Sequence, residues 1–505
     1  MSKYRQTARG LFVVITALSS CSAWAASPSP TSTWSSGPAP SLAPIPCIGD
    51  CSGTHTVAVD DVITLVNIAL GTVERAACAH GVPSAAEVNV AVIIQAVNSA
   101  LKGCPAPSPT PTPTASPRGT LVINASEGVG IISQTPGRPI IGAAPRMPAQ
   151  YRVTHPDEVR VETYISGLEV PWSLAFAPDS RLFISERPGR VRVASAGVLD
   201  PTPWTTFQVS AGTSEGGLMG LALDPDFAHE PWVYVCYTFD DAGTPENRIS
   251  RVREVSGRGG NEEILLDRFP GAAIHDGCRL KFGPDGKLYA TTGDSFQRSL
   301  AQDLGSLAGK ILRLNRDGSV PADNPFGASS LIYSYGHRNP QGLAFDPQSG
   351  ALFETEHGPS GEVGFGNYDE VNIIRAGGNY GWPNVVGAPH LDAYPDPLLA
   401  FPDFAVPPAG ATFYTATRIP QWTGNFFFTS LRAEHLQRVV LDVSRTQVVA
   451  IERLFEEAIY QGFYGRLRDV MQGPDDALYV TTSNRDGRGQ PAPDDDRVLR
   501  LVPAL

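Results

Sequence analysis

Hydrophobic and polar residues alternate in short runs over most of the chain, from about residue 153 onward. Leu280 and Phe282, for example, alternate with polar neighbours and lead into Pro284-Asp285-Gly286, after which a second run begins. An alternation of period two predicts a half-buried strand, and Pro followed by Asp-Gly supplies the backbone angles of a tight turn. The pattern therefore predicts antiparallel β-hairpins.

The same strand, turn and strand recur along the chain. The turn prolines are Pro178, Pro225, Pro284, Pro347 and Pro474. The last interval is about two repeats long, and residues 424–430 supply the strand that is expected inside it. Such a unit cannot bury its apolar face alone, whereas several units closed into a ring leave only short, protected edges. We predict an all-β, six-bladed β-propeller over residues 153–505, with four strands in each blade.

The N-terminal end has a different pattern. Residues 1–25 combine basic residues, an apolar run and a final stretch of small residues. This order is typical of a secretory signal peptide, and the apolar run is too short to span a membrane. We favour cleavage after Ala25, which predicts a secreted or periplasmic protein. The residues up to Cys21 also resemble a bacterial lipoprotein box, so lipid anchoring at this cysteine stays open.

Two segments rich in Ser, Pro and Thr flank a small module. Residues 26–46 and the beginning of 105–152 have the composition of extended linkers. Between them, residues 47–104 contain two stretches with apolar residues at helical spacing, 60–70 and 85–101. Four of the seven cysteines fall in this module. Export permits disulfides, but spacing alone does not give their connectivity.

This module resembles a dockerin-type module, whose two loop-helix repeats are similar to halves of EF-hands. The oxygen-bearing residues at positions one, three, five and twelve of its first loop are Asp50, Ser52, Thr54 and Asp61. The second loop, 79–84, has almost no ligand side chains. Two interpretations stay open: a calcium-binding module that docks on a partner protein, and a disulfide-stapled pair of helices without calcium.

Composition excludes some partners. The formal net charge is −12 at pH 7, which argues against a nucleic acid as the main partner because such binding rests on clustered Lys and Arg. The 50 glycines and 45 prolines favour turns, linkers and β structure over helix bundles.

Candidate chemistry lies at the ends of the hairpin over residues 274–294. His275 precedes its first strand and Asp294 follows its second. Antiparallel pairing brings these ends to the same edge of the sheet, so the imidazole and the carboxylate are predicted to meet. Other predicted strand ends carry similar motifs with a glycine in or next to a group of charged or polar residues, namely 215–217, 336–340, 356–359, 379–382 and 466–469. Propeller ligands bind at the channel mouth, so we expect these loops to form one site.

Together these motifs, in this order and over nearly all of residues 153–505, resemble the soluble PQQ-dependent glucose/aldose sugar dehydrogenases. The resemblance implies a six-bladed propeller that binds pyrroloquinoline quinone (PQQ) over the channel, with a calcium ion between cofactor and protein. It implies that His275 is the general base for the anomeric hydroxyl, that Asp294 orients it, and that Arg338 faces the quinone oxygen where charge develops.

The resemblance also implies the residues that hold the cofactor, which is a tricarboxylate. The expected cofactor-binding residues are Glu215, Asn339, Arg432, Arg466 and Arg468. The backbone carbonyls of Gly358 and Pro359 are the expected calcium ligands. Trp382 is interpreted as a packing residue. The loop over residues 360–368 is longer than is common in the family, which leaves the substrate entrance and the sugar open. Cys278 is either a buried thiol or a partner of Cys236.

The leading hypothesis is an exported dehydrogenase that oxidises the C1 hydroxyl of an aldose to the lactone and passes electrons to an external acceptor. Two alternatives stay open. A calcium-dependent lactonase-type propeller would need carboxylate and Asn ligands in the channel, whereas the predicted cluster is basic. A non-catalytic propeller would bind carbohydrate or protein, with the small module as its attachment. The sequence leaves the sugar, the acceptor and the oligomeric state open.

Overall fold

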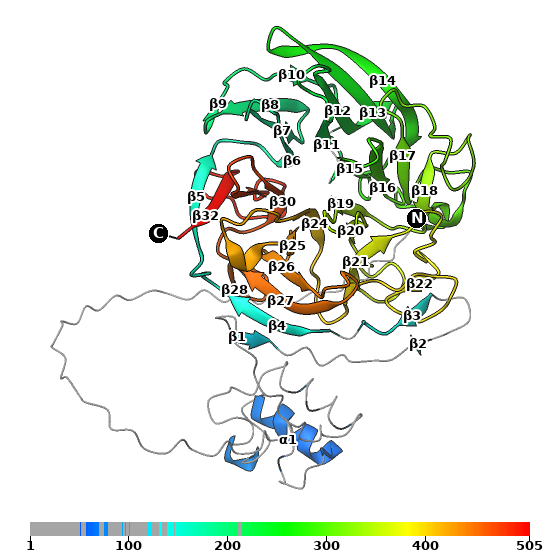
Figure 1. Cartoon of the computed structure of the whole chain (residues 1–505). Coiled ribbons are helices and arrows are strands. Elements are labelled where there is room, and N and C mark those ends of the chain that lie inside the picture. Colours follow the sequence, from blue (N-terminus) through cyan, green and yellow to red (C-terminus); the bar gives the residue numbers. More distant parts are fainter. Residues whose placement is uncertain are drawn as a thin grey trace, which may run out of the picture. The chain divides into compact units, whose positions relative to one another are not determined.

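The computed structural model describes residues 51, 57–69, 75–78, 93, 96, 100, 120–122, 131–133, 139–145, 147–210 and 215–504. The chain divides into two compact units, Met1–Thr114 and Ala115–Leu505 (Figure 1). The predicted signal peptide and three predicted calcium ligands, Asp50, Ser52 and Thr54, lie outside the described residues. Among the residues that are described, no helix is long and apolar enough to cross a membrane.

The smaller unit contains helix α1 (Val59–Ala69), where the apolar spacing predicts it, and the short 3-10 helix η1 (Arg75–Cys78). The buried carboxylate of Asp61 accepts a hydrogen bond of 2.8 Å from the backbone N–H of Ala58. This contact satisfies a free donor at the beginning of the helix, as in a capping box. Most of the second predicted helix lies outside the described residues, and three of its residues are helical: Ile93, Ala96 and Ala100.

Six of the sheets in the described part of the larger unit each include four consecutive strands that form one blade (Figure 1). The first of these sheets, in chain order, contains β6 (Pro171–Phe176), β7 (Leu182–Glu186), β8 (Arg190–Ser195) and β10 (Thr205–Thr206), with β9 (Val198–Leu199) also paired to β8. The second contains β11 (Leu218–Leu223), β12 (Trp232–Asp241), β13 (Thr244–Val255) and β14 (Arg258–Pro270). The third contains β15 (Gly277–Phe282), β16 (Leu288–Thr292), β17 (Lys310–Leu314) and β18 (Ile332–Tyr335). The fourth contains β19 (Pro340–Phe345), β20 (Leu352–Glu356), β21 (Asp369–Ile374) and β23 (Leu399–Phe401). The fifth contains β24 (Pro408–Phe413), β25 (Phe426–Ser430), β26 (Leu436–Leu441) and β27 (Val448–Leu454). The sixth contains β30 (Leu467–Gln472), β31 (Leu478–Thr482), β32 (Val498–Pro503) and β5 (Val159–Ile165).

These sheets are the blades of a closed ring, so the prediction of a six-bladed propeller is confirmed. The innermost strands β6, β11, β15, β19, β24 and β30 each contact the next, and β30 contacts β6 again. Strand β5, from the beginning of the ring, pairs with β32 from its end, which closes the ring through main-chain hydrogen bonds. The recurring Pro turns join the first and second strands of five blades, and β25 is the strand expected within residues 424–430.

Several short elements lie outside the blades. Strand β4 (Ala149–Val153) pairs in parallel with β27, and β1 (Thr120–Val122) pairs with β4, so the segment before residue 153 widens the fifth blade. Strands β2 (Ile131–Ser133), β3 (Ile140–Gly142) and β22 (Val385–Val386) form a small sheet. The remaining elements are β28 (Glu456–Ala458), β29 (Gln461–Gly462), and the 3-10 helices η2 (Arg298–Gln302) and η3 (Pro420–Trp422).

Apolar side chains fill the spaces between blades. The largest fully buried ones include Trp172, Trp204, Trp422, Tyr234 and Phe353. One buried cluster, for example, joins residues from β11, β12, β15, β16 and β17 and so spans the second and third blades. Because each blade buries its faces against its neighbours, the ring is stable only as a whole.

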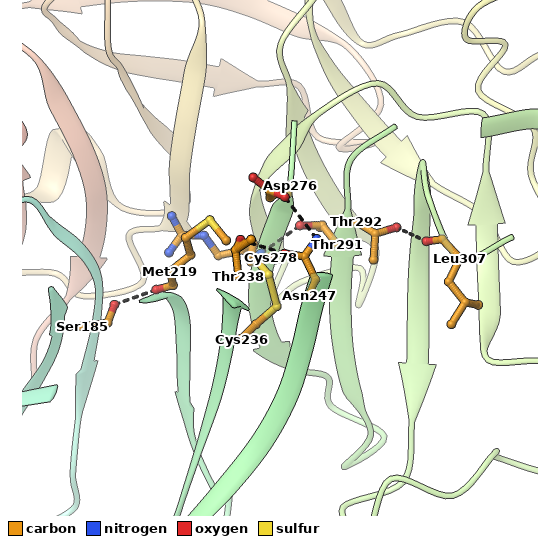
Figure 2. Close-up of a disulfide and its surroundings, with 12 residues drawn as sticks. Ser185, Met219, Cys236, Thr238, Asn247, Asp276, Cys278, Thr291, Thr292 and Leu307 are labelled. Carbon is orange, nitrogen blue, oxygen red and sulfur yellow. Dashed lines mark hydrogen bonds between the residues drawn. A yellow bond between two sulfur atoms is a disulfide. The ribbon is translucent and has the colours of Figure 1, made fainter. Parts of the chain in front are cut away.

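Two disulfides lie within the described residues. Cys236 of β12 bonds to Cys278 of β15, which decides between the two interpretations of Cys278 and links the second blade to the third (Figure 2). Both cysteines are fully buried. Hydrogen bonds surround them, including one of 2.8 Å from Thr238 to Asn247. In the smaller unit, Cys51 bonds to Cys78.

Candidate active site

The blade topology gathers the candidate residues at one end of the ring. The first strand of each blade begins at this end and the second strand finishes there, because the two are antiparallel. Residues that precede β11, β15, β19 and β30, and residues that follow β16, β20, β25 and β31, therefore share one face. This arrangement places Glu215, His275, Asp294, Arg338, Asn339, Gly358, Pro359, Arg432 and Arg466 in loops at the same end, with Arg468 in the first residues of β30.

His275 and Asp294 meet as antiparallel pairing predicts. Imidazole Nδ1 lies 2.8 Å from Asp294 Oδ1, and the residues are 6% and 2% exposed, respectively. His275 has a φ of 64°, a backbone conformation that costs energy for a residue with a side chain and is often found at functional sites. Gly293 permits this turn, since a Cβ atom there would lie 1.9 Å from the carbonyl oxygen of His275.

Asp294 is held from three directions. Oδ1 also accepts a hydrogen bond of 2.9 Å from the backbone N–H of Phe296, and Oδ2 accepts one of 2.8 Å from Nε1 of Trp382. Trp382 is buried, as its interpretation as a packing residue requires, and in addition it orients the carboxylate. Because the carboxylate of Asp294 accepts a hydrogen bond from the N–H at Nδ1 of His275, the Nε2 atom is left as the basic nitrogen.

Glu215 and Asn339 bind the backbone of the segment that carries His275. Glu215 Oε2 accepts a hydrogen bond of 3.1 Å from the backbone N–H of His275, and Asn339 Oδ1 accepts one of 3.2 Å from that of Gly277. Glu215 Oε1 lies 2.9 Å from the guanidinium of Arg488. Burial opposes ionisation of Glu215, but its interactions with His357, Arg488 and His275 prevail and lower its pKa to about 2. The carboxylate is therefore charged.

Arg338 is buried beside the His275–Asp294 pair. Its backbone carbonyl accepts a hydrogen bond of 2.7 Å from the N–H of Asp294, which ties the third and fourth blades together. Its guanidinium lies 2.6 Å from Glu362, donates to the carbonyl of His357 at 3.1 Å, and stands 5.6 Å from the centre of the Trp382 ring.

Arg466 and Arg468 both lie near the carboxylate of Asp486. Arg466 lies 2.8 Å from Asp486, and Arg468 lies 3.9 Å from the same carboxylate. Arg468 also donates to Gln341 at 2.7 Å. Burial lowers the pKa of Arg468 to about 9. Arg432, by contrast, is exposed, and its guanidinium lies 4.6 Å from the centre of the Tyr460 ring.

The expected calcium ligands, Gly358 and Pro359, follow directly after β20. The N–H of Gly358 donates to Oδ1 of Asp369 at 2.9 Å, and Oδ2 of Asp369 accepts from the N–H of Val406 at 2.7 Å. A Cβ atom on Gly358 would lie 2.2 Å from the carbonyl oxygen of Asn367, so only glycine fits. Backbone carbonyls are ligands that calcium accepts.

A second group of possible metal ligands lies close by. His337, Glu354 and Glu356 offer ligand atoms that all lie within 4.8 Å of one another, and all three residues are buried. Burial and the neighbouring Glu356 carboxylate raise the pKa of Glu354 well above its ordinary value. Burial also raises the pKa of nearby Glu370, to about 8. These acids are thus either neutral or bound to a cation. The two carboxylates one residue apart on a buried strand were a signal for this group that sequence reasoning missed.

Sequence reasoning also missed other residues of the site: His357, Glu362, Trp382 and Arg488. His357 stands in the motif Glu356-His357-Gly358-Pro359, which was the available signal. Among the described residues, no hydrogen-bond partner is found for the buried atoms His357 Nε2 and Arg468 Nε. Burial lowers the pKa of His357 to about 3, so its imidazole is neutral. Unpaired donors beside several guanidinium groups fit a ligand that carries carboxylates and carbonyl oxygens.

Comparison with known proteins agrees with this geometry. The family model described as Glucose / Sorbosone dehydrogenase matches residues 168–492. The aldose sugar dehydrogenase YliI of Escherichia coli is 34% identical over 355 residues, which cover 66% of this chain and 92% of that protein. Quinoprotein glucose dehydrogenase B of Acinetobacter calcoaceticus is 34% identical, over 48% of this chain and 56% of that protein.

Solved structures of similar proteins are also described as sugar dehydrogenases. A putative oxidoreductase (glucose dehydrogenase) from Thermus thermophilus is 46% identical, with a TM-score of 0.62, and the match covers 68% of this chain and all of that one. The PQQ-bound form of an aldose sugar dehydrogenase from Streptomyces coelicolor is 35% identical, with a TM-score of 0.60, over 69% of this chain and 99% of that one. The prediction of a sugar dehydrogenase is thereby confirmed at the level of the family, and this chain belongs to the glucose/sorbosone dehydrogenase family.

Proposed function

We propose that the protein is an exported PQQ-dependent dehydrogenase that oxidises the C1 hydroxyl of an aldose to the lactone. The observation that carries the proposal is a buried His275–Asp294 pair, 2.8 Å apart, beside a group of buried arginines. A base held by a carboxylate suits proton removal, and the guanidinium groups suit an anionic cofactor. Relatives whose names specify aldose, glucose or PQQ support the same function.

The residues present fit the cofactor. Arg466, Arg468 and Arg338 supply positive charge, and Asn339 together with the unpaired His357 nitrogen supplies hydrogen bonds. The carbonyls of Gly358 and Pro359 are the proposed ligands of a bridging calcium ion. Bound PQQ would supply an acceptor for the two electrons and the hydrogen that leave C1 as a hydride. Arg338 would stabilise negative charge that develops at the acceptor.

The chain itself manages the proton. Nε2 of His275 takes the proton of the C1 hydroxyl as the C1–H bond breaks, and the C1 oxygen becomes the carbonyl of the lactone. Asp294 keeps Nδ1 protonated and stabilises the positive charge that forms on the ring. Trp382 and the N–H of Phe296 hold that carboxylate in place, while Glu215 fixes the backbone of His275. Removing the proton in concert lowers the barrier to hydride loss.

Export, calcium binding by Asp50, Ser52, Thr54 and Asp61, a protein partner for the small module, and electron transfer to an external quinone or redox protein complete the proposal. The first three parts rest on the sequence patterns of the N-terminal segments, and the external acceptor rests on the family resemblance of the propeller. Isolation of the processed protein from the medium or periplasm, followed by N-terminal sequencing, tests export and distinguishes cleavage after Ala25 from lipidation at Cys21.

Dye-linked reduction tests the activity. Purified apo-protein with calcium is assayed against a panel of aldoses, with and without PQQ, alongside His275→Ala. We expect activity only with PQQ and its loss in the variant. His229→Ala is a matched control, because His229 also pairs with an aspartate, Asp226, at 2.7 Å, but in an exposed turn at the opposite end of the second blade.

The control should keep full activity. If calorimetry detects no PQQ binding, the dehydrogenase proposal is wrong and a binding propeller becomes the better hypothesis. If PQQ binds and His275→Ala keeps wild-type kcat, the general-base assignment is wrong while the enzyme class stands.

A further inference from the structure

Arg338 has an acidic partner from a neighbouring loop. Nε of Arg338 lies 2.6 Å from Oε1 of Glu362, and this guanidinium is only 3% exposed. The loop carrying Glu362 connects β20 to β21 and includes residues 360–368, which the family resemblance marks as longer than is common. One of the positive charges in the candidate site is therefore balanced by a carboxylate from this loop.

The position of Glu362 is fixed by its own loop. The next residue, Val363, is buried in the core of the fourth and fifth blades, and Phe365 packs against that core. Arg298 donates to the carbonyl of Glu362 at 2.9 Å, and Glu362 Oε2 accepts from the N–H of Ser360 at 2.7 Å. These four contacts hold the carboxylate against Arg338 and restrict its movement.

Glu362 contacts a residue of the proposed cofactor site. The guanidinium of Arg338 contacts Glu362 and also lies 5.6 Å from the centre of the Trp382 ring, and Trp382 holds Asp294, so one guanidinium connects Glu362 with the His275–Asp294 pair. The Glu362 side chain is only 22% exposed, so solvent screens its charge only in part. A negative charge here repels a ligand with several carboxylates and reduces the attraction that Arg338 offers.

We propose that Glu362 is a positioning residue with two effects: it holds the guanidinium of Arg338 in place, and its charge weakens the affinity of the site for PQQ. This inference rests on the proposed function. It predicts that removing the charge while keeping the shape makes PQQ bind more tightly, which is the opposite of what a purely structural ion pair would give. Glutamine is the suitable substitution, because its Oε1 can still accept the hydrogen bond from Arg338, and the one contact it loses is the bond from the N–H of Ser360.

The experiment is a calorimetric titration of apo-protein with PQQ at constant calcium concentration. It compares the wild type with Glu362→Gln and Glu362→Asp. We expect Kd to fall about three- to tenfold in Glu362→Gln, the size of one unit charge acting within several ångströms in a partly screened site. The aspartate variant keeps the charge and should stay near the wild-type Kd. Added salt should weaken binding more steeply in the glutamine variant.

Glu230→Gln is the matched control. Glu230 pairs with Arg253 at 2.6 Å, the same distance, but lies between β11 and β12 at the far end of the blade. Its substitution should leave the Kd for PQQ unchanged. Weaker or unchanged PQQ binding in Glu362→Gln would overturn the inference and leave the proposed function intact. A wild type that binds no PQQ would overturn both.

Discussion

Removal of the Cys236–Cys278 disulfide should destabilise the propeller by an amount that follows from its place in the chain. The bond joins residues 42 positions apart, and closing a loop of that length in the unfolded chain is worth about 4 kcal/mol at 25 °C in the chain-entropy model. Both cysteines are fully buried between two blades, so lost packing acts in the same direction (Figure 2). Cys236→Ala/Cys278→Ala removes the bond without placing a hydroxyl in the core.

Thermal unfolding by calorimetry measures the effect. At about 2.1 cal/mol/K of unfolding entropy per residue, a propeller of this size should lose about 5 °C in Tm. Cys51→Ala/Cys78→Ala is the control, because that bond lies in the smaller unit and should leave the propeller transition unchanged. A propeller Tm unchanged in the first double variant, with thiol counts showing that the wild type is oxidised, would refute the reasoning.

Two further substitutions test the site. Asp294→Asn should lower kcat by about 100-fold or more in the dye-linked assay, because His275 loses the carboxylate that fixes its basic nitrogen. The Kd for PQQ should stay the same. An unchanged kcat would contradict the orienting role of Asp294. Asp276 is fully buried, and burial raises its pKa to about 7, so the folded state keeps a proton that the unfolded state releases as the pH rises above about 4. Stability from this group is therefore lost between about pH 4 and pH 7, and Asp276→Asn should be more stable relative to wild type at pH 8 than at pH 4.5, by about 2–4 kcal/mol in denaturant titrations. An equal difference at both pH values would show that Asp276 does not titrate in this range.

The sequence could predict those parts of the structure that depend on the local pattern of residues. Period-two alternation and Pro turns depend on neighbouring residues, so they gave the hairpins, the repeat and the six blades. The approach of His275 to Asp294 followed in the same way, because both residues belong to one hairpin whose pairing is antiparallel. The family resemblance then named a set of residues that the topology gathers at one end of the ring.

Other parts depend on how distant segments meet. Trp382 could be interpreted as a packing residue, but its bond to Asp294 spans 88 positions and requires the third and fourth blades to be in contact. Arg488 reaches Glu215 across 273 positions, a contact that exists only because the ring closes. Local periodicity says nothing about such pairs, since it records which face a residue occupies and not which blade lies opposite.

The chain by itself thus determined the strands, the blade count and the hairpin that carries the candidate base. Tertiary structure decided the pairing of Cys236 with Cys278 and of Glu362 with Arg338, and it placed Arg432 at an exposed position over Tyr460. The physical reason is that charge, burial and hydrogen bonding in the site arise where loops from different blades converge, and that convergence is a property of the closed ring.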